Sequence, residues 1–195
     1  MTLSNTRVIF KKRPEQSATP DCFDVITEPL SALGPNKVRV AVEYLSVDAG
    51  VRTMLTGEGF HRQVPIGGTI LAGGVGRVIE STAETWQPGQ AVSGSFGAQT
   101  IATVPIAQLK KVTEVPGLPL SVHLGVLGGS TGVTAWIGMR HVARPQAGDT
   151  FVVSAAAGAV GSIAGQIAKK EGAKVIGIAG DSRKTSYLVE QLGFD

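Results

Sequence analysis

The residues with the clearest potential for chemistry lie between positions 155 and 161, directly after a short apolar run. Compared with the dinucleotide-binding pattern G-x-G-x-x-G, this segment supplies Gly158 and Gly161, while Ala156 replaces the first glycine. Gly158 would let the backbone approach a pyrophosphate, and Gly161 would let a helix pack closely against a strand. The N-terminus of such a helix favours an anion. The spacing predicts a dinucleotide-phosphate loop; the alternative is a glycine-packed helix that binds nothing.

The segment GDSRK, residues 180–184, lies about 20 residues further on, where a dinucleotide site distinguishes NAD from NADP. Arg183 and Lys184 can meet a 2′-phosphate, which favours NADP. Asp181 supports the opposite reading, because a carboxylate here could accept a hydrogen bond from the ribose 2′-hydroxyl of NAD. A third reading is structural: Asp181 or Ser182 caps the next helix and the two basic residues face solvent. We favour NADP.

The elements that would position these residues alternate between strand and helix. Residues 150–154 and 174–178 are typical of short buried strands, whereas 158–170 and 183–192 have helical spacing. A membrane span over 151–168 is disfavoured, because its centre consists mostly of Ala, Gly and Ser and its period changes. The order strand–helix–strand–helix predicts a parallel sheet of the doubly wound type.

The preceding part of the chain is predicted to be rich in β-structure. Four segments, 37–47, 69–80, 90–95 and 99–104, have strand character and are separated by Gly and Pro turns. Glycines within 69–80 indicate a bulge or a barrel corner. These features predict a small barrel or sandwich.

Residues 124–140 are the first stretch with helical spacing, which predicts a helix there. We therefore divide the chain into two domains, residues 1–122 and 123–195. Two parallel strands are fewer than the usual six or so of a doubly wound sheet. We therefore expect either that the sequence is part of a longer protein or that another structure covers the strand edges.

Composition excludes several classes of function. The net charge is only +3, basic residues are scattered and aromatics make up 5% of the chain, so we expect no nucleic-acid partner. Cys22 is the single cysteine, which rules out an internal disulfide and a cysteine-based zinc cluster. The N-terminal segment lacks an apolar signal region, and we expect a cytoplasmic protein with no membrane partner.

The three histidines, His61, His123 and His141, show no paired spacing, so we expect no metal site. His61 lies in the polar segment GEGFHRQ beside Glu58. It would either line the mouth of a substrate site or be an exposed loop histidine, and the second reading is favoured.

The strings GVTAWIGM and AAAGAVGS, followed by GQIAK, GIAG and LGFD, closely resemble the zinc-independent medium-chain dehydrogenase/reductases. Within this family, the sequence most resembles the type that comprises prostaglandin reductase, leukotriene B4 12-hydroxydehydrogenase and 2-alkenal double-bond reductase. YLSVDAGVRTML and GVGRVIES are similar to the substrate domain of the same family. The resemblance implies a GroES-like β-barrel domain followed by the first βαβα part of a Rossmann domain.

The resemblance also assigns cofactor-binding residues and shows some departures. The family's aspartate-to-arginine loop motif falls on 48–52, with Gly50 where some members have a pocket aromatic; Trp136 and Thr131 replace a tyrosine and a proline. These departures concern the substrate class rather than the fold. The implied NADP(H) contacts are Thr134, the loop residues Gly158, Ala159, Val160 and Gly161, and Lys184 for the 2′-phosphate.

The implied activity is hydride transfer from NADPH to the β-carbon of an α,β-unsaturated ketone or aldehyde, with a homodimer as the full-length assembly. No general acid is identified. Two alternatives stay open: a quinone reductase of the same superfamily, and a chain that binds a nucleotide or a partner without catalysis.

Overall fold

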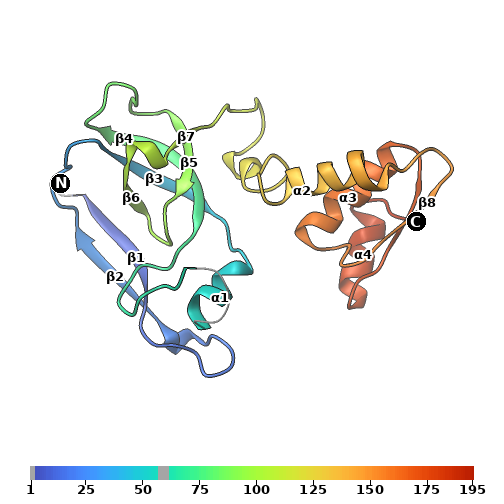
Figure 1. Ribbon diagram of the computed structural model, residues 1–195, viewed down its shortest axis with the longest axis horizontal. Coiled ribbons are helices and arrows are strands. Elements are labelled where there is room, and N and C mark those ends of the chain that lie inside the picture. The colour runs from blue at the N-terminus through green and yellow to red at the C-terminus, as the bar shows by residue number, and fades with distance from the viewer. Residues whose placement is uncertain (1–2, 57–61) are drawn as a thin grey trace. The chain divides into compact units, whose positions relative to one another are not determined.

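The structure is a computed structural model that describes residues 3–56 and 62–195 (Figure 1). The chain forms two compact units, Met1–Ser121 and Val122–Asp195. The first contains antiparallel strands, and the second contains helices packed on one face of a parallel strand pair. This is the expected combination of a GroES-like β-domain and the first βαβα part of a Rossmann domain. Val152 and Ile176, on the other face of this pair, are exposed, so, contrary to the expectation, the two strands are not fully buried.

The first unit contains a two-stranded sheet, β1–β2, and a five-stranded sheet in the order β6-β3-β4-β5-β7. A short helix, α1, joins the region of β3 to that of β4. The elements are β1 (Ser4–Phe10), β2 (Phe23–Pro29), β3 (Lys37–Leu45), α1 (Gly50–Thr56), β4 (Gly73–Ser81), β5 (Ala91–Ser95), β6 (Ile101–Pro105) and β7 (Lys110–Lys111), with 3-10 turns at Pro20–Cys22, Ile106–Gln108 and Leu120–His123.

The pairing of β3 with β4 explains the glycines in the second predicted strand. Val38, Val40 and Val78 are fully buried, so alternate residues of these strands form the core. The pairing register shifts twice along β3, which confirms the predicted bulge. A Cβ at Gly76 would overlap the carbonyl group of Ala41, so only glycine permits this approach of the two strands.

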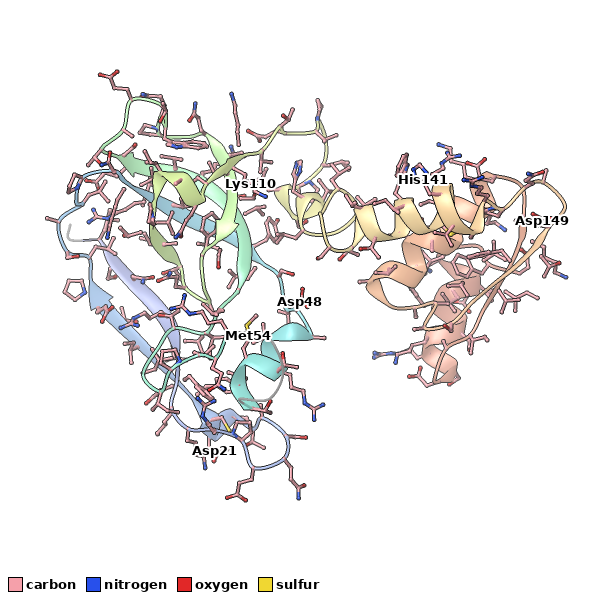
Figure 2. All side chains as sticks on the ribbon, in the orientation of Figure 1. Asp21, Asp48, Met54, Lys110, His141 and Asp149 are labelled. Carbon is pink, nitrogen blue, oxygen red and sulfur yellow. The ribbon has the colours of Figure 1, made fainter. Side chains whose placement is uncertain are left out.

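Helix α1 begins with a side-chain cap. Asp48 lies just before this helix (Figure 2). Its carboxylate accepts a hydrogen bond from the Gly50 N–H at 3.1 Å, and Thr53 Oγ1 donates to the Gly50 carbonyl at 2.8 Å. The aspartate of the family's loop motif therefore orients α1, and Gly50 lies at the first position of that helix.

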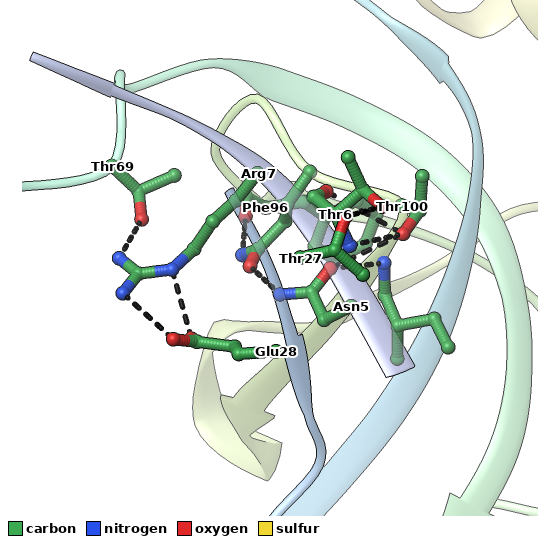
Figure 3. Close-up of polar contacts among 10 residues, drawn as sticks. Asn5, Thr6, Arg7, Thr27, Glu28, Thr69, Phe96 and Thr100 are labelled. Atoms are coloured by element: carbon green, nitrogen blue, oxygen red, sulfur yellow. Dashed lines mark hydrogen bonds and ion pairs between the residues drawn. The ribbon is translucent and has the colours of Figure 1, made fainter. Parts of the chain in front are cut away.

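The β1–β2 hairpin is attached to the rest of the first unit by polar side chains from distant segments (Figure 3). Asn5, which is only 6% exposed, donates to the Gln99 side chain and accepts from the Ile101 N–H. Arg7 contacts Glu28 within the hairpin and Thr69 outside it. These contacts satisfy the polar groups buried beneath the hairpin.

A surface ion pair within the segment that connects β1 to β2, between Lys12 and Asp21, is expected to be sensitive to acid. Asp21 is hydrogen-bonded by Lys12 and Thr19, and these bonds lower its pKa from the ordinary 3.8 to about 2. A depressed folded-state pKa stabilises the fold above the unfolded pKa, and this contribution disappears as the pH falls from about 4 to about 2. We expect an NMR titration of Asp21 to have its midpoint near 2, and Lys12→Met to move it toward 3.8. A wild-type midpoint already near 3.8 would contradict the contact.

The second unit contains α2 (Gly132–Ile137), a π-helical turn (Gly138–Ala143), β8 (Thr150–Val153), α3 (Ala159–Lys170), β9 (Lys174–Gly177) and α4 (Ser182–Glu190). Strands β8 and β9 pair in parallel, with Thr150 opposite Lys174 and Val153 opposite Gly177. The predicted βαβα order is thus confirmed. No helix in the described ranges combines the length and the hydropathy needed to cross a membrane.

The expected helix over 124–140 is wrong in its first half. Residues 124–131 form turns, and helical structure begins at Gly132 and continues to Ala143. Glycines allow the chain to turn here instead of forming a helix. The Gly128 N–H donates to the Gly125 carbonyl in a turn, and a Cβ at Gly132 would overlap the Val126 carbonyl. The apolar residues Val126 and Leu127 of this stretch are about half exposed, so their spacing marks neither a helix nor a buried face.

Candidate functional site

The loop that connects β8 to α3 is held in a tight turn by its backbone. The Ala156 N–H donates to the Ile178 carbonyl at 3.0 Å, so the loop begins as a continuation of the parallel pair. Ala155 then adopts a left-handed conformation, with φ of 47°. The Gly158 N–H closes the turn by donating to the Ala155 carbonyl at 2.8 Å. The backbone is thereby brought directly to the start of α3.

Gly161 lies where the first turn of α3 meets this loop. A Cβ at this position would lie 2.5 Å from the Ala155 carbonyl oxygen and 3.0 Å from the Ala156 Cα. Both atoms belong to the backbone and cannot rotate away. The absence of a side chain at Gly161 is therefore what allows α3 to pack so closely on the loop after β8.

The N-terminus of α3 is suited to an anion. Its N-cap residue, Gly158, has an extended backbone and provides no side chain to cap the helix, and the first turn contains no acidic residue. Ala159 and Val160 are exposed. The first N–H groups of an α-helix have no acceptor within the helix, so this end presents free donors at the positive end of the helix dipole.

A hollow of about 280 Å³ lies beside this helix end. The two loops that follow β8 and β9 form its walls, and its one charged lining residue is a lysine whose side chain is half exposed. The lining residues are Ala155, Ala157, Gly158, Ala179, Gly180 and Lys184.

The lysine of the hollow is coupled to Asp181 at the start of α4. Asp181 is the N-cap residue of this helix, and its Oδ1 accepts a hydrogen bond from the Lys184 N–H at 2.9 Å. The other carboxylate oxygen lies 3.6 Å from Lys184 Nζ. The helix-capping interpretation of Asp181 is thus confirmed, and the same side chain also contacts the cation that faces the hollow.

The structure brings together some of the site residues expected from the sequence and leaves others apart. Gly158 and Lys184 line one hollow, and Ala159 to Gly161 begin the helix beside it. Arg183 is exposed and is not among the lining residues. Thr134 is also absent from the lining; its hydroxyl donates to the carbonyl of Ser130, at 2.6 Å, within the turn that precedes α2.

Sequence reasoning missed the alanines of the lining, which carry no polar group. Their position directly after each parallel strand, at the carboxyl end of the sheet, is the signal that could have identified them. His61 lies outside the described residues. Within residues 3–56 and 62–195, no group of three or more His, Cys, Asp or Glu side chains is arranged to hold a metal ion.

Comparison with known proteins places this arrangement in a family. Residues 6–112 match the family described as the N-terminal domain of oxidoreductase. The chain is 36% identical to NADPH-dependent curcumin reductase of Escherichia coli (strain K12) over 192 residues, which are 98% of this chain and 55% of the relative. It is also 36% identical to prostaglandin reductase 1 of Oryctolagus cuniculus, covering 95% of this chain and 51% of the relative.

A solved structure agrees with these sequence matches. The crystal structure of CurA from Vibrio vulnificus in complex with NADPH superimposes with a TM-score of 0.81 at 31% identity, covering 97% of this chain and 56% of that one. The chain thus spans about half the length of the curated relatives it matches. Fold, loop geometry and relatives agree, and the chain belongs to the medium-chain dehydrogenase/reductases that carry this N-terminal oxidoreductase domain.

Proposed function

We propose that the protein is a zinc-independent, NADPH-dependent oxidoreductase that reduces the C=C bond of α,β-unsaturated ketones and aldehydes. The observation that carries this proposal is the hollow at the carboxyl end of β8 and β9, where a glycine loop, a free helix N-terminus and Lys184 meet. Relatives named as NADPH-dependent curcumin reductase and prostaglandin reductase support the reaction class. When bound, NADPH supplies the hydride.

The residues present fit the cofactor. A Cβ at Gly158 or Gly161 would approach the Ala155 carbonyl oxygen at 3.0 Å or less, so both glycines let the loop turn tightly into α3 beside the hollow. We propose that the pyrophosphate lies against the backbone of Gly158 and accepts hydrogen bonds from the N–H groups of Ala159, Val160 and Gly161, and that Lys184 holds the 2′-phosphate. A hydrogen bond or ion pair to each group orients the cofactor without taking part in bond making. Thr134 is proposed as a further cofactor contact.

The resemblance to the family suggests a separate role for each of the two parts of the chain. We propose that residues 1–122 form the substrate domain and that residues 123–195 contribute to the NADP-binding domain. We further propose a cytoplasmic location and a homodimeric assembly for the full-length protein. A screen of enones, enals and quinones with NADPH distinguishes the proposed activity from a quinone reductase.

The experiment that tests the cofactor site compares two lysine variants. Lys184→Ala is expected to weaken NADPH binding about tenfold or more, because it removes a charge-assisted contact worth about 1.5–3 kcal/mol. NADH binding should change little, since NADH lacks the 2′-phosphate. Fluorescence titration of both nucleotides against the purified chain measures these affinities.

Lys170→Ala is the matched control, because it removes the same charge at the opposite end of α3. It should leave both affinities unchanged. Equal losses for NADPH and NADH in Lys184→Ala, or equal losses in the two variants, would contradict a 2′-phosphate site at Lys184. Saturable binding without turnover of any enone, enal or quinone would favour nucleotide binding without catalysis.

A further inference from the structure

Asp181 places a negative charge next to the one charged residue that lines the proposed cofactor hollow. It follows Gly180, which lines the hollow, and its carboxylate lies 3.6 Å from Lys184 Nζ. Both side chains are about half exposed, at 52% each, so neither is locked in place by burial. The carboxylate can therefore influence whichever nucleotide occupies the hollow.

The effect on NADPH is unfavourable. A phosphate monoester carries a charge of about −1.5 to −2 near neutral pH, and two negative groups near one lysine compete for it. Part of the attraction of Lys184 is already satisfied by Asp181, and the carboxylate also repels the incoming phosphate. The same residue that caps α4 should therefore lower the affinity for NADPH.

The effect on NADH has the opposite sign. A carboxylate at the end of the second strand is the group that accepts a hydrogen bond from the ribose 2′-hydroxyl in NAD sites. Asp181 follows β9 by four residues and occupies this region. A lysine for the 2′-phosphate and a carboxylate for the 2′-hydroxyl thus lie side by side in this chain.

We infer that Asp181 determines the cofactor preference, and that it makes the protein accept NADH as well as NADPH by narrowing the difference between their affinities. Asp181 acts partly through Lys184, so it is a specificity-determining residue rather than a catalytic one. This inference rests on the proposed function, because it concerns the same hollow.

The test uses substitutions that remove the charge and keep the cap. Serine and asparagine cap helices about as well as aspartate, so Asp181→Ser and Asp181→Asn should preserve α4. The control is Glu190→Gln, which changes the charge equally at the other end of the same helix. Calorimetric titration with NADPH and with NADH gives the dissociation constants, and circular dichroism checks the helix.

In both Asp181 variants we expect the ratio of NADPH to NADH affinity to rise about three- to tenfold, as removal of one nearby like charge predicts. The rise should shrink at high salt, because the groups are half exposed. Glu190→Gln should leave the ratio unchanged.

Two failures are distinguishable. If the wild-type chain binds both nucleotides and the ratio is the same in Asp181→Ser and Asp181→Asn, Asp181 only caps α4 and the inference is overturned. If neither nucleotide binds the wild-type chain, the proposed function fails and this inference fails with it.

Discussion

Alanine at position 161 is expected to destabilise the second unit and to weaken nucleotide binding at least tenfold. The added Cβ would lie 2.5 Å from the Ala155 carbonyl oxygen, so either α3 or the loop must move. Overpacking of this kind costs about 1–3 kcal/mol. Because the loop is also the proposed phosphate cradle, the displacement that relieves the overlap removes the N–H groups from the anion. Chemical denaturation and NADPH titration of the same variant measure both effects.

Gly138→Ala is the matched control for this substitution. Gly138 has helical backbone angles, with φ of −56°, and nothing lies within 4 Å of an added Cβ. Alanine there should stabilise the chain by about 0.4–1 kcal/mol, because it restricts the unfolded state and favours the helix. Opposite signs for the same chemical change would show that the contact with Ala155, not the loss of a glycine, is responsible. A Gly161→Ala variant with wild-type stability and NADPH affinity would contradict this account of the loop.

Phe194→Ala should produce the largest loss of stability in the second unit. Phe194 is 3% exposed, and its ring occupies the space that side chains at Gly165 and Gly177 would otherwise take. Truncation of a buried phenylalanine costs about 3–5 kcal/mol, a large part of the about 5–15 kcal/mol available to a typical domain. Hydrogen exchange at amides of α3 and β9 reports on this unit separately from the first.

A double variant tests whether the ring and the glycine are coupled. Gly165→Ala alone should destabilise the unit, because its Cβ would overlap the Phe194 ring. In the Phe194→Ala background the same methyl group enters the vacated space and should be neutral or stabilising, which is non-additive behaviour. Val189→Ala, on the exposed side of α4, should have little effect in either background. Additive losses from the two core substitutions would argue against this packing.

The second unit could be predicted closely from its sequence because its signals are local. A strand followed by a glycine-rich turn and a helical period fixes β8 and α3, and from residue 150 onward the structure places each expected boundary within about two residues. The stretch 124–140 is the exception, because its helix begins only at Gly132. The expected α4 began at Arg183, whereas the helix begins at Ser182 because Asp181 caps it.

The β1–β2 hairpin was not resolved from the sequence into individual strands. It is held by contacts between residues far apart in the chain, such as Asn5 with Gln99 and Arg7 with Thr69, and no local pattern encodes such pairs. The site shows the same limit. Lys184 and Gly158 could be named from motifs, but the alanines beside them become part of a site only once the two loops meet.

The most direct test of the central claim is to map a nucleotide onto backbone amides by NMR. Titration of the chain with 2′,5′-ADP should shift the amides of residues 157–161 and of Lys184, with smaller changes at Lys184 when 5′-ADP, which lacks the 2′-phosphate, is used. This result would place the phosphates at the N-terminus of α3 and at the start of α4, as proposed. Shifts confined to other parts of the chain, or no shifts with a folded chain at millimolar ligand, would contradict the proposed cofactor site.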